Sequence, residues 1–179
     1  CTAMESVLET VIVQLDEETG VARIVLNRPD SLNALSSQLR SDIASGIELL
    51  EEFDAESDGS AVRVLVVEGA GARAFCAGAD INEFTDNVGS FFSICPARQA
   101  FEDCLIPIIA KIDGYCLGGG FELAFAADIR IASEHSEFGF PEINHGILPA
   151  GGGIQYLTRM VGPARTMELL LEGSHFAPR

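Results

Sequence analysis

The first thirty residues alternate apolar and polar side chains, which is the pattern of a strand with one buried face. Val7, Val11, Val13 and Leu15 fall on one phase of this alternation, and a polar stretch with Gly20 ends it. A second apolar run occupies residues 21–27. Two such runs joined by a short turn with glycine predict a β-hairpin.

The period then changes from two residues to about 3.6, which predicts a helix. The apolar positions with this spacing are Leu39, Ile43, Ile47 and Leu50. Ser36 precedes them, where a hydroxyl can cap the first turn. We predict a helix from Ser36 to about residue 53 and a polar loop over 54–60.

The rest of the chain alternates short apolar runs with helical segments. Strands are predicted at 62–67, 106–112 and 128–132, and helices at 96–104, 119–127, 154–160 and 163–171. The first two runs are nearly continuous, so we expect strands buried on both faces. Glycine-rich turns and loops are predicted at 69–78, 114–120 and 139–153. The alternation, without a linker or a fixed repeat, predicts one α/β domain over residues 1–179.

Charge excludes several partners. The chain has 27 acidic and 11 basic residues, a net charge of −16, and a single lysine, Lys111. Nucleic acids and anionic membranes require clustered cations, so neither is expected to bind. No apolar run approaches the roughly 20 residues that span a bilayer. Acidic residues spread along the whole chain predict adaptation to high salt; the alternative is an ordinary acidic cytosolic enzyme.

Cysteine and histidine usage points to the cytoplasm and away from metal. The five cysteines are an odd number without a C-x-x-C pair, and Cys76, Cys104 and Cys116 have apolar neighbours. We therefore expect reduced thiols, with these three used as small core residues. No charged and apolar leader opens the sequence, and the histidines lack the spacing of metal ligands.

One sequence motif suggests an alternative function, but the residues that follow it do not support that function. Gly69-x-Gly71-x-x-Ala74 follows a predicted strand and resembles a dinucleotide-binding fingerprint. That fingerprint should open a helix directly, yet residues 75–78 extend the irregular stretch, and no suitably placed acidic residue follows. We therefore do not expect a dinucleotide. The motifs of serine hydrolases, zinc proteases, P-loop proteins and EF-hands are missing altogether.

Three segments together favour an oxyanion site with acid–base groups. Small residues at 75–81 would let a ligand approach the backbone. The triple glycine 118–120 leads into a predicted helix, whose free N–H groups suit a developing oxyanion. Glu122 falls in the first turn of that helix, and Glu142 follows Pro141 on a loop. Two carboxylates at such a site suit general acid–base chemistry.

Each of these residues also has an alternative explanation that is purely structural. Glu122 could stabilise its helix by interacting with the helix dipole. Glu142 and His145 could be ordinary polar residues of a solvated loop. In a chain with 27 acidic residues, two glutamates are weak evidence. The triple glycine is a stronger signal, because consecutive glycines weaken a fold unless their backbone geometry is needed.

An ordered set of short motifs is more specific than any one of them. The set comprises Asn27-Arg28-Pro29, Asn33-Ala34-Leu35, Ala77-Gly78-Ala79-Asp80-Ile81, residues 114–123, residues 138–142 and Gly146-Ile147-Leu148-Pro149. With these motifs in order over essentially its whole length, the chain resembles the crotonase (enoyl-CoA hydratase/isomerase) superfamily.

The resemblance implies a spiral of repeated ββα units, forming two sheets flanked by helices. It implies an acyl-CoA thioester substrate, with no separate cofactor because coenzyme A is part of the substrate. The oxyanion hole would consist of the backbone N–H groups of Ala79 and Gly119. Carried over by position, the residues expected to bind substrate and CoA are Arg28, Ala34, Ala77, Ala79, Asp80, Ile81, Asn82, Gly118, Gly119 and Pro141. A homo-oligomer, as a trimer or a dimer of trimers, is also implied.

Glutamate at both acid–base positions is typical of the hydratases in this family. By analogy Glu142 would deliver a proton to Cα, while Glu122 would orient and activate the water that adds to Cβ of a trans-2-enoyl-CoA. This implies an enoyl-CoA hydratase, as in fatty acid β-oxidation. The alternatives are an isomerase or another acyl-CoA reaction of the family, or a catalytically incompetent fragment.

The chain departs from the family pattern in two places. Family members continue past Gly173 into further helices, so the C-terminal helical part looks truncated, and apolar surface over 154–171 is expected to be exposed. Tyr156 stands where many members have arginine. With a single lysine, the CoA phosphates would depend on arginines such as Arg28, or on the missing segment.

The charge pattern predicts a response to salt. Screening of the net charge of −16 should make folding and hydration activity both improve as NaCl or KCl rises to molar levels. Urea denaturation and the activity assay at a series of salt concentrations measure the two effects. A protein most stable in dilute buffer would contradict the prediction.

Overall fold

The chain opens with three antiparallel strands rather than a two-stranded hairpin. The computed structural model describes residues 3–83 and 95–178, and begins with β1 (Ala3–Val7), β2 (Val11–Asp16) and β3 (Val21–Leu26). The single strand predicted through Val7 and Val11 is wrong, because the chain reverses between them and pairs Val7 with Ile12. The turn is closed by a bond from the N–H of Leu8 to the carbonyl of Val11.

The long helix α1 (Ser37–Glu56) starts where the sequence indicated. The Ser36 hydroxyl accepts a hydrogen bond from the N–H of Leu39 at 3.1 Å, as an N-cap does. All four predicted apolar positions of the helix are buried. The helix runs three residues beyond its predicted end, into the expected polar loop.

Repeated ββα units follow, and each gives one strand to each of two sheets. The units consist of β4 (Val64–Gly69), β5 (Ala74–Cys76) and α2 (Pro96–Asp103); β6 (Ile108–Ile112), β7 (Tyr115–Leu117) and α3 (Gly119–Ala126); and β8 (Ile129–Ala132), β9 (Glu137–Gly139) and α4 (Gly153–Val161). Short 3-10 turns η1 (Pro29–Ser31), η2 (Ile81–Glu83) and η4 (Pro141–His145), helix α5 (Pro163–Glu172) and strand β10 (His175–Phe176) complete the described elements. This is the expected α/β spiral of ββα units.

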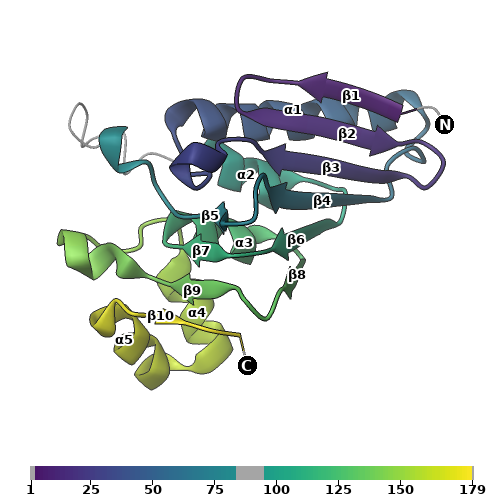
Figure 1. The fold of residues 1–179 in the computed structure, drawn as a ribbon. Helices are drawn as coiled ribbons and strands as arrows, with labels where there is room; N and C mark the ends of the chain where they lie inside the picture. Colours follow the sequence, from purple (N-terminus) through teal and green to yellow (C-terminus); the bar gives the residue numbers. More distant parts are fainter. Residues whose placement is uncertain (1–2, 84–94, 179) are drawn as a thin grey trace.

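The larger sheet has the order β1-β2-β3-β4-β6-β8, and the smaller one β10-β9-β7-β5 (Figure 1). Pairing is parallel from β3 to β8 and among β5, β7 and β9. The strands of the smaller sheet were not predicted, because they have three residues or fewer and lie in or beside segments rich in glycine. Ala74 begins β5 and not a helix, so this glycine segment does not lead into a helix as a dinucleotide fingerprint does.

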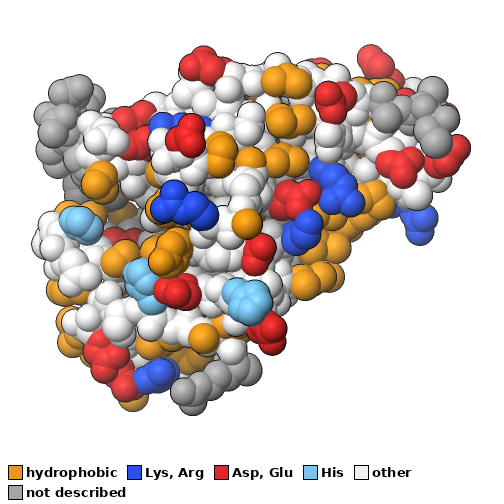
Figure 2. Space-filling view, in the orientation of Figure 1, with side chains coloured by type: hydrophobic (Ala, Val, Ile, Leu, Met, Phe, Trp, Pro, Cys, Tyr) orange, Lys and Arg blue, Asp and Glu red, His pale blue; other side chains and the backbone are white. Residues whose placement is uncertain are grey.

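The expectation that the central strands are buried on both faces is wrong. Leu65 and Val67 of β4 are fully buried, whereas Val64 and Val66, which point to the other face, are only partly buried. The outer face of the sheet carries an ion-pair network in which Glu68 bonds Arg23 at 3.1 Å and Lys111 at 2.5 Å. Acidic side chains are scattered over the face shown in Figure 2, with basic side chains among them.

An aromatic cluster joins the smaller sheet to α3. The ring of Phe121 in α3 stacks on Phe125 at 4.3 Å and on Phe140 at 5.2 Å, and lies 5.0 Å from Phe138 of β9. The helices α4 and α5 beyond it expose apolar side chains, as expected for residues 154–171. These are Met160, Val161, Met167 and Leu171.

Asn33 ties together the loops that lead into the smaller sheet. It is fully buried, and its backbone has a φ of +53°, a conformation that asparagine tolerates. Its Oδ1 accepts from the N–H of Arg28 at 2.9 Å, and its Nδ2 donates to the carbonyls of Ala70 (3.1 Å) and Ala74 (2.8 Å). Two residues after Asn33, the N–H of Leu35 donates to the carbonyl of Gly78 at 2.8 Å. By fixing the loop before Leu35, the Asn33 side chain therefore helps to place the segment after β5.

Asn33→Ala should lower the free energy of unfolding by about 3 kcal/mol, because it leaves buried backbone groups without hydrogen-bond partners. Urea denaturation measures the change. The matched control is Asn144→Ala, at an exposed asparagine with one 3.3 Å bond to the carbonyl of Gly173, where a loss below about 0.5 kcal/mol is expected. Equal losses in the two variants would contradict the role of Asn33.

Candidate functional site

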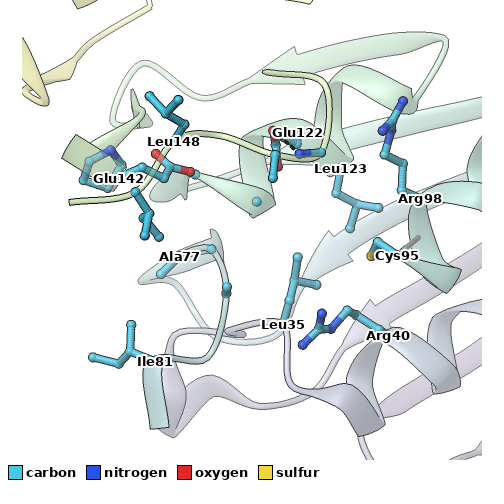
Figure 3. A pocket seen from close by; sticks show the side chains of 18 of the residues that line it. Leu35, Arg40, Ala77, Ile81, Cys95, Arg98, Glu122, Leu123, Glu142 and Leu148 are labelled. Atoms are coloured by element: carbon cyan, nitrogen blue, oxygen red, sulfur yellow. Dashed lines mark hydrogen bonds between the residues drawn. The ribbon is translucent and has the colours of Figure 1, made fainter. Parts of the chain in front are cut away.

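A cavity lies where the carboxyl ends of the parallel strands β5, β7 and β9 meet (Figure 3). Its volume is about 800 Å³. The segments that follow the three strands form much of its wall: residues 77–81 after β5, 118–123 after β7, and 141–151 beyond β9. The carboxyl edge of parallel strands is where α/β folds commonly bind ligands. Leu35, Arg40 of α1 and residues of α2 complete the lining.

The backbones of Ala79 and Gly119 lie side by side in this cavity. A Cβ placed on Gly119 would lie 3.7 Å from the nitrogen of Ala79 and 3.4 Å from a methyl group of Leu35. Within residues 3–83 and 95–178, neither N–H donates to another residue. Gly119 is the first residue of α3, so the positive end of the helix dipole coincides with its N–H. Together the two groups can bind an oxygen that carries negative charge.

The neighbours of the triple glycine explain why two of its members must be glycine. Gly118 has a φ of +49°, and a Cβ there would lie 2.7 Å from Oε1 of Glu142. A Cβ on Gly120 would collide with the carbonyl of Cys76 in β5. The glycines therefore let α3 start against β5 and leave room for the Glu142 carboxylate.

Glu122 is buried and held by the start of another helix. Its Oε1 accepts hydrogen bonds from the N–H groups of Gly151 at 2.8 Å and Gly153 at 2.9 Å, and Gly153 is the first residue of α4. Burial raises the pKa of Glu122, while these two bonds and the charge of Arg98 act in the opposite direction. The two hydrogen bonds and the charge of Arg98 thus offset part of the cost of ionising this buried carboxyl group, although its pKa remains above the usual value.

Glu142 lies on the same side of the cavity as Glu122 in Figure 3, but its environment is different. It is in the first turn of η4, and its buried Oε2 has no hydrogen-bond partner in the described part of the chain. Burial raises the pKa of Glu142 to about 7, and the neighbouring Glu122 adds to the rise. One carboxyl group is therefore supported as an anion, and the other keeps its proton up to near-neutral pH.

The structure brings together most of the residues expected to bind substrate, but not all. The expected residues that line the cavity are Ala77, Ala79, Ile81, Gly118, Gly119 and Pro141. Those outside its lining are Arg28, Ala34, Asp80 and Asn82. Arg28 pairs with Asp80 at 2.9 Å and donates to the carbonyl of Ala34 at 2.5 Å. These two contacts connect the loop around Ala34 to the segment that contains Ala79. Burial opposes ionisation of Asp80, but hydrogen bonds from Arg28 and Asn82 hold its pKa below the usual value.

Several lining residues were not singled out from the sequence. They include Arg40, Arg98, Gln99 and Glu102. Arg98 and Glu102 are four residues apart on α2, a spacing that marks one helix face, but only tertiary packing turns that face to the cavity. His145, considered from the sequence as an ordinary loop residue, also lines the cavity.

Residues 3–83 and 95–178 hold no group of three or more histidine, cysteine, aspartate or glutamate side chains placed to bind a metal ion. Over the same residues, none of the helices has both the length and the apolar character needed to cross a membrane.

Known proteins resemble the chain in both sequence and structure. The family profile described as enoyl-CoA hydratase/isomerase matches residues 16–179. A probable enoyl-CoA hydratase (echA8) of Mycobacterium bovis is 41% identical over 171 residues, which cover 92% of this chain and 62% of the relative. A crotonyl-CoA hydratase of Syntrophomonas wolfei is 36% identical over 168 residues, covering 90% of this chain and 61% of the relative.

A solved structure agrees with these sequence relatives. An enoyl-CoA hydratase subunit I of Geobacillus kaustophilus superposes with a TM-score of 0.83 at 37% identity, covering 96% of this chain and 65% of that one. The chain spans somewhat over three fifths of the length of the curated relatives that it matches. The profile match over most of the chain, together with these identities, shows that the chain belongs to the enoyl-CoA hydratase/isomerase family.

Proposed function

We propose that this protein is an enoyl-CoA hydratase, which adds water across the trans-2 double bond of an enoyl-CoA thioester. The observation that carries the proposal is a pair of glutamates in different environments, next to the adjacent N–H groups of Ala79 and Gly119, neither of which donates to another of the described residues. Glu122 accepts two backbone hydrogen bonds, and Glu142 has a buried oxygen without a partner in the described residues. Addition of water needs both a base and an acid, and this pair supplies one of each.

The N–H groups of Ala79 and Gly119 bind the thioester oxygen in this mechanism. Negative charge develops on that oxygen as the new bond forms at Cβ, giving an enolate. Donors already in place at such an oxygen typically contribute roughly 3 to 4 kcal/mol each to transition-state stabilisation. Their position at the start of α3 adds the field of the helix dipole.

The two glutamates then divide the proton transfers. Glu122 takes a proton from water as the water oxygen bonds to Cβ, and the electron pair of the double bond moves into the enolate. Glu142 gives its proton to Cα, and the enolate returns to a thioester carbonyl. A 3-hydroxyacyl-CoA results, with the atoms of one water molecule added. Relatives named as hydratases, among them a crotonyl-CoA hydratase, support this reaction.

The substrate, the cellular compartment and the oligomeric state are part of the same proposal. The acyl-CoA thioester is the substrate, and coenzyme A enters only as part of it. Free thiols at Cys76, Cys95, Cys104 and Cys116 support a reducing compartment such as the cytoplasm. The exposed apolar side chains of α4 and α5 offer a surface for further protein contacts, either with the C-terminal helices of the family or with other subunits. The family resemblance is the reason for proposing a homo-oligomer, as a trimer or a dimer of trimers.

The first test is the loss of enoyl thioester absorbance with crotonyl-CoA, in high salt. Formation of 3-hydroxybutyryl-CoA by the folded chain would support the proposal. If the chain is folded but inactive, the assay is repeated on a version extended to the length of the relatives. Inactivity in both would contradict the proposal, and a product with a shifted double bond would identify an isomerase.

Glu142→Gln and Glu122→Gln should each lower kcat roughly 10²- to 10⁴-fold, because each removes one of the two proton transfers. The substitutions keep the side-chain volume, so circular dichroism should show an unchanged fold. Steady-state kinetics with crotonyl-CoA measures the loss. Full activity in either variant would refute the role of that residue.

The proton on Glu142 should also appear in the pH dependence of stability. Its pKa rises from 4.5 to about 7 on folding, so the stability it contributes is full below about pH 4.5 and is lost as pH rises through about 7. Glu142→Gln cannot ionise and should gain stability relative to the unmodified chain between pH 5 and pH 8. Urea denaturation at the two pH values measures the difference.

Glu48→Gln, at an exposed glutamate of α1, is the matched control and should show no such gain. If Glu142→Gln behaves like Glu48→Gln across this range, Glu142 does not retain its proton in the folded protein.

A further inference from the structure

Arg98 lies against the turn that holds the Glu122 carboxylate. The N–H groups of Gly151 and Gly153 both donate to Glu122, and Gly152 between them has a φ of +97°. A Cβ on Gly152 would lie 3.2 to 3.4 Å from Nη2, Cζ and Nη1 of Arg98. The guanidinium therefore packs on the middle of this turn.

The position of Arg98 is fixed by a set of contacts between three helices. Within α2, its Nη2 pairs with Glu102 at 2.6 Å. The hydroxyl of Tyr156, in α4, donates to the same carboxylate at 3.3 Å. The Tyr156 ring stacks on Phe125 of α3 with centroids 5.7 Å apart and planes 17° from parallel. The tyrosine that departs from the family pattern thus connects α2, which carries Arg98, to α3, which carries Glu122.

Arg98 also supplies positive charge toward Glu122. In Figure 3 the two side chains both lie above Leu123. The elements packed against α3 carry these titratable groups: Arg98, Glu102 and Asp103 on α2, Tyr156 and Arg159 on α4, Cys76 on β5, and Tyr115 and Cys116 on β7. Glu142 and His145 of η4 line the same cavity as Glu122. Burial raises the pKa of both thiols, so they stay neutral near pH 7. Glu102 is paired with Arg98, and Arg98 is the group among these whose charge favours an ionised Glu122.

We propose that Arg98, braced by Glu102 and Tyr156, is a positioning residue that holds the turn 151–153 and thereby keeps Glu122 in place as the base. The role rests on the proposed hydratase function. Arg98 acts through the turn and through its charge, and it takes no proton itself. A loosened turn would leave the Glu122 carboxylate misplaced relative to the water, and small misplacements of this kind reduce rates by one to two orders of magnitude.

The test compares Arg98→Gln and Arg98→Lys with Arg165→Gln. Arg165 is the matched control, an exposed arginine that pairs with Glu168 at 2.6 Å on α5. Kinetics with crotonyl-CoA over a range of pH gives kcat, KM and the acidic limb of the rate profile. Carbon-13 NMR of glutamate carboxyl groups, with the Glu122 signal assigned by its loss in Glu122→Gln, follows the ionisation of Glu122 without turnover.

Arg98→Gln should lower kcat roughly 10- to 100-fold with little change in KM. The base must be ionised, so activity is lost as pH falls through the pKa of Glu122. Removal of a cation raises that pKa, and both the acidic limb and the NMR titration should move to higher pH. Arg98→Lys should keep the acidic limb near its original place while losing part of kcat, because it retains charge but not the planar guanidinium. Arg165→Gln should change neither.

Tyr156→Phe provides a milder test, because it keeps the charge of Arg98 and the aromatic ring that packs on Phe125. It removes only the hydroxyl that bonds Glu102, and it should move both measurements in the same direction as Arg98→Gln, by less. If Arg98→Gln and Tyr156→Phe leave kcat and the Glu122 titration unchanged in an active enzyme, Arg98 is not a positioning residue. If the Glu122 titration moves as expected in a folded protein without hydratase activity, the hydratase proposal fails and the contact between Arg98 and Glu122 stands.

Discussion

The close approach of two backbone segments organises this molecule. Strands β5 and β7 pair in parallel, and α3 begins directly after β7 with Gly120 against the carbonyl of Cys76 in β5. A side chain at Gly120 would collide with that carbonyl, so the approach depends on glycine. It places the N–H of Ala79 beside the start of α3, where the helix dipole adds to the attraction for negative charge. The cavity, the carboxyl pair and the turn under Arg98 are all built around this junction.

The two glutamates near this junction, Glu122 and Glu142, have different environments. Glu122 lies at the N-terminal end of α4 and accepts two backbone hydrogen bonds, which offset part of the cost of burying a carboxylate. Glu142 has an oxygen buried without a partner in the described residues, and it retains its proton to a higher pH. Burial of an ionisable group costs free energy of folding unless its hydrogen bonds compensate. Such local costs are common where a fold carries a reactive site.

The spiral of ββα units explains why residues far apart in sequence meet here. Each unit gives one strand to each sheet, and the smaller sheet aligns the carboxyl ends of β5, β7 and β9. The segment after each of these strands contributes a different part: an N–H group with small residues, the start of a helix with Glu122, and the short turn with Glu142. The repeat is therefore visible in the strand order, while its three loops differ in sequence.

The sequence by itself determined the α/β class, the position of α1 with its Ser36 cap, and the helices from α2 to α5 to within a few residues. These features follow from local periodicity and capping, which neighbouring residues encode. It also identified Glu122, Glu142, Ala79 and Gly119 as candidates through motifs that resemble a known family. Only the tertiary structure decided that β5, β7, β9 and β10 are strands, because such short segments are stabilised by their partners and not by their own pattern. The same holds for the partners of the two glutamates and for the face of α2 that carries Arg98, since burial and charge at these sites come from segments distant in sequence.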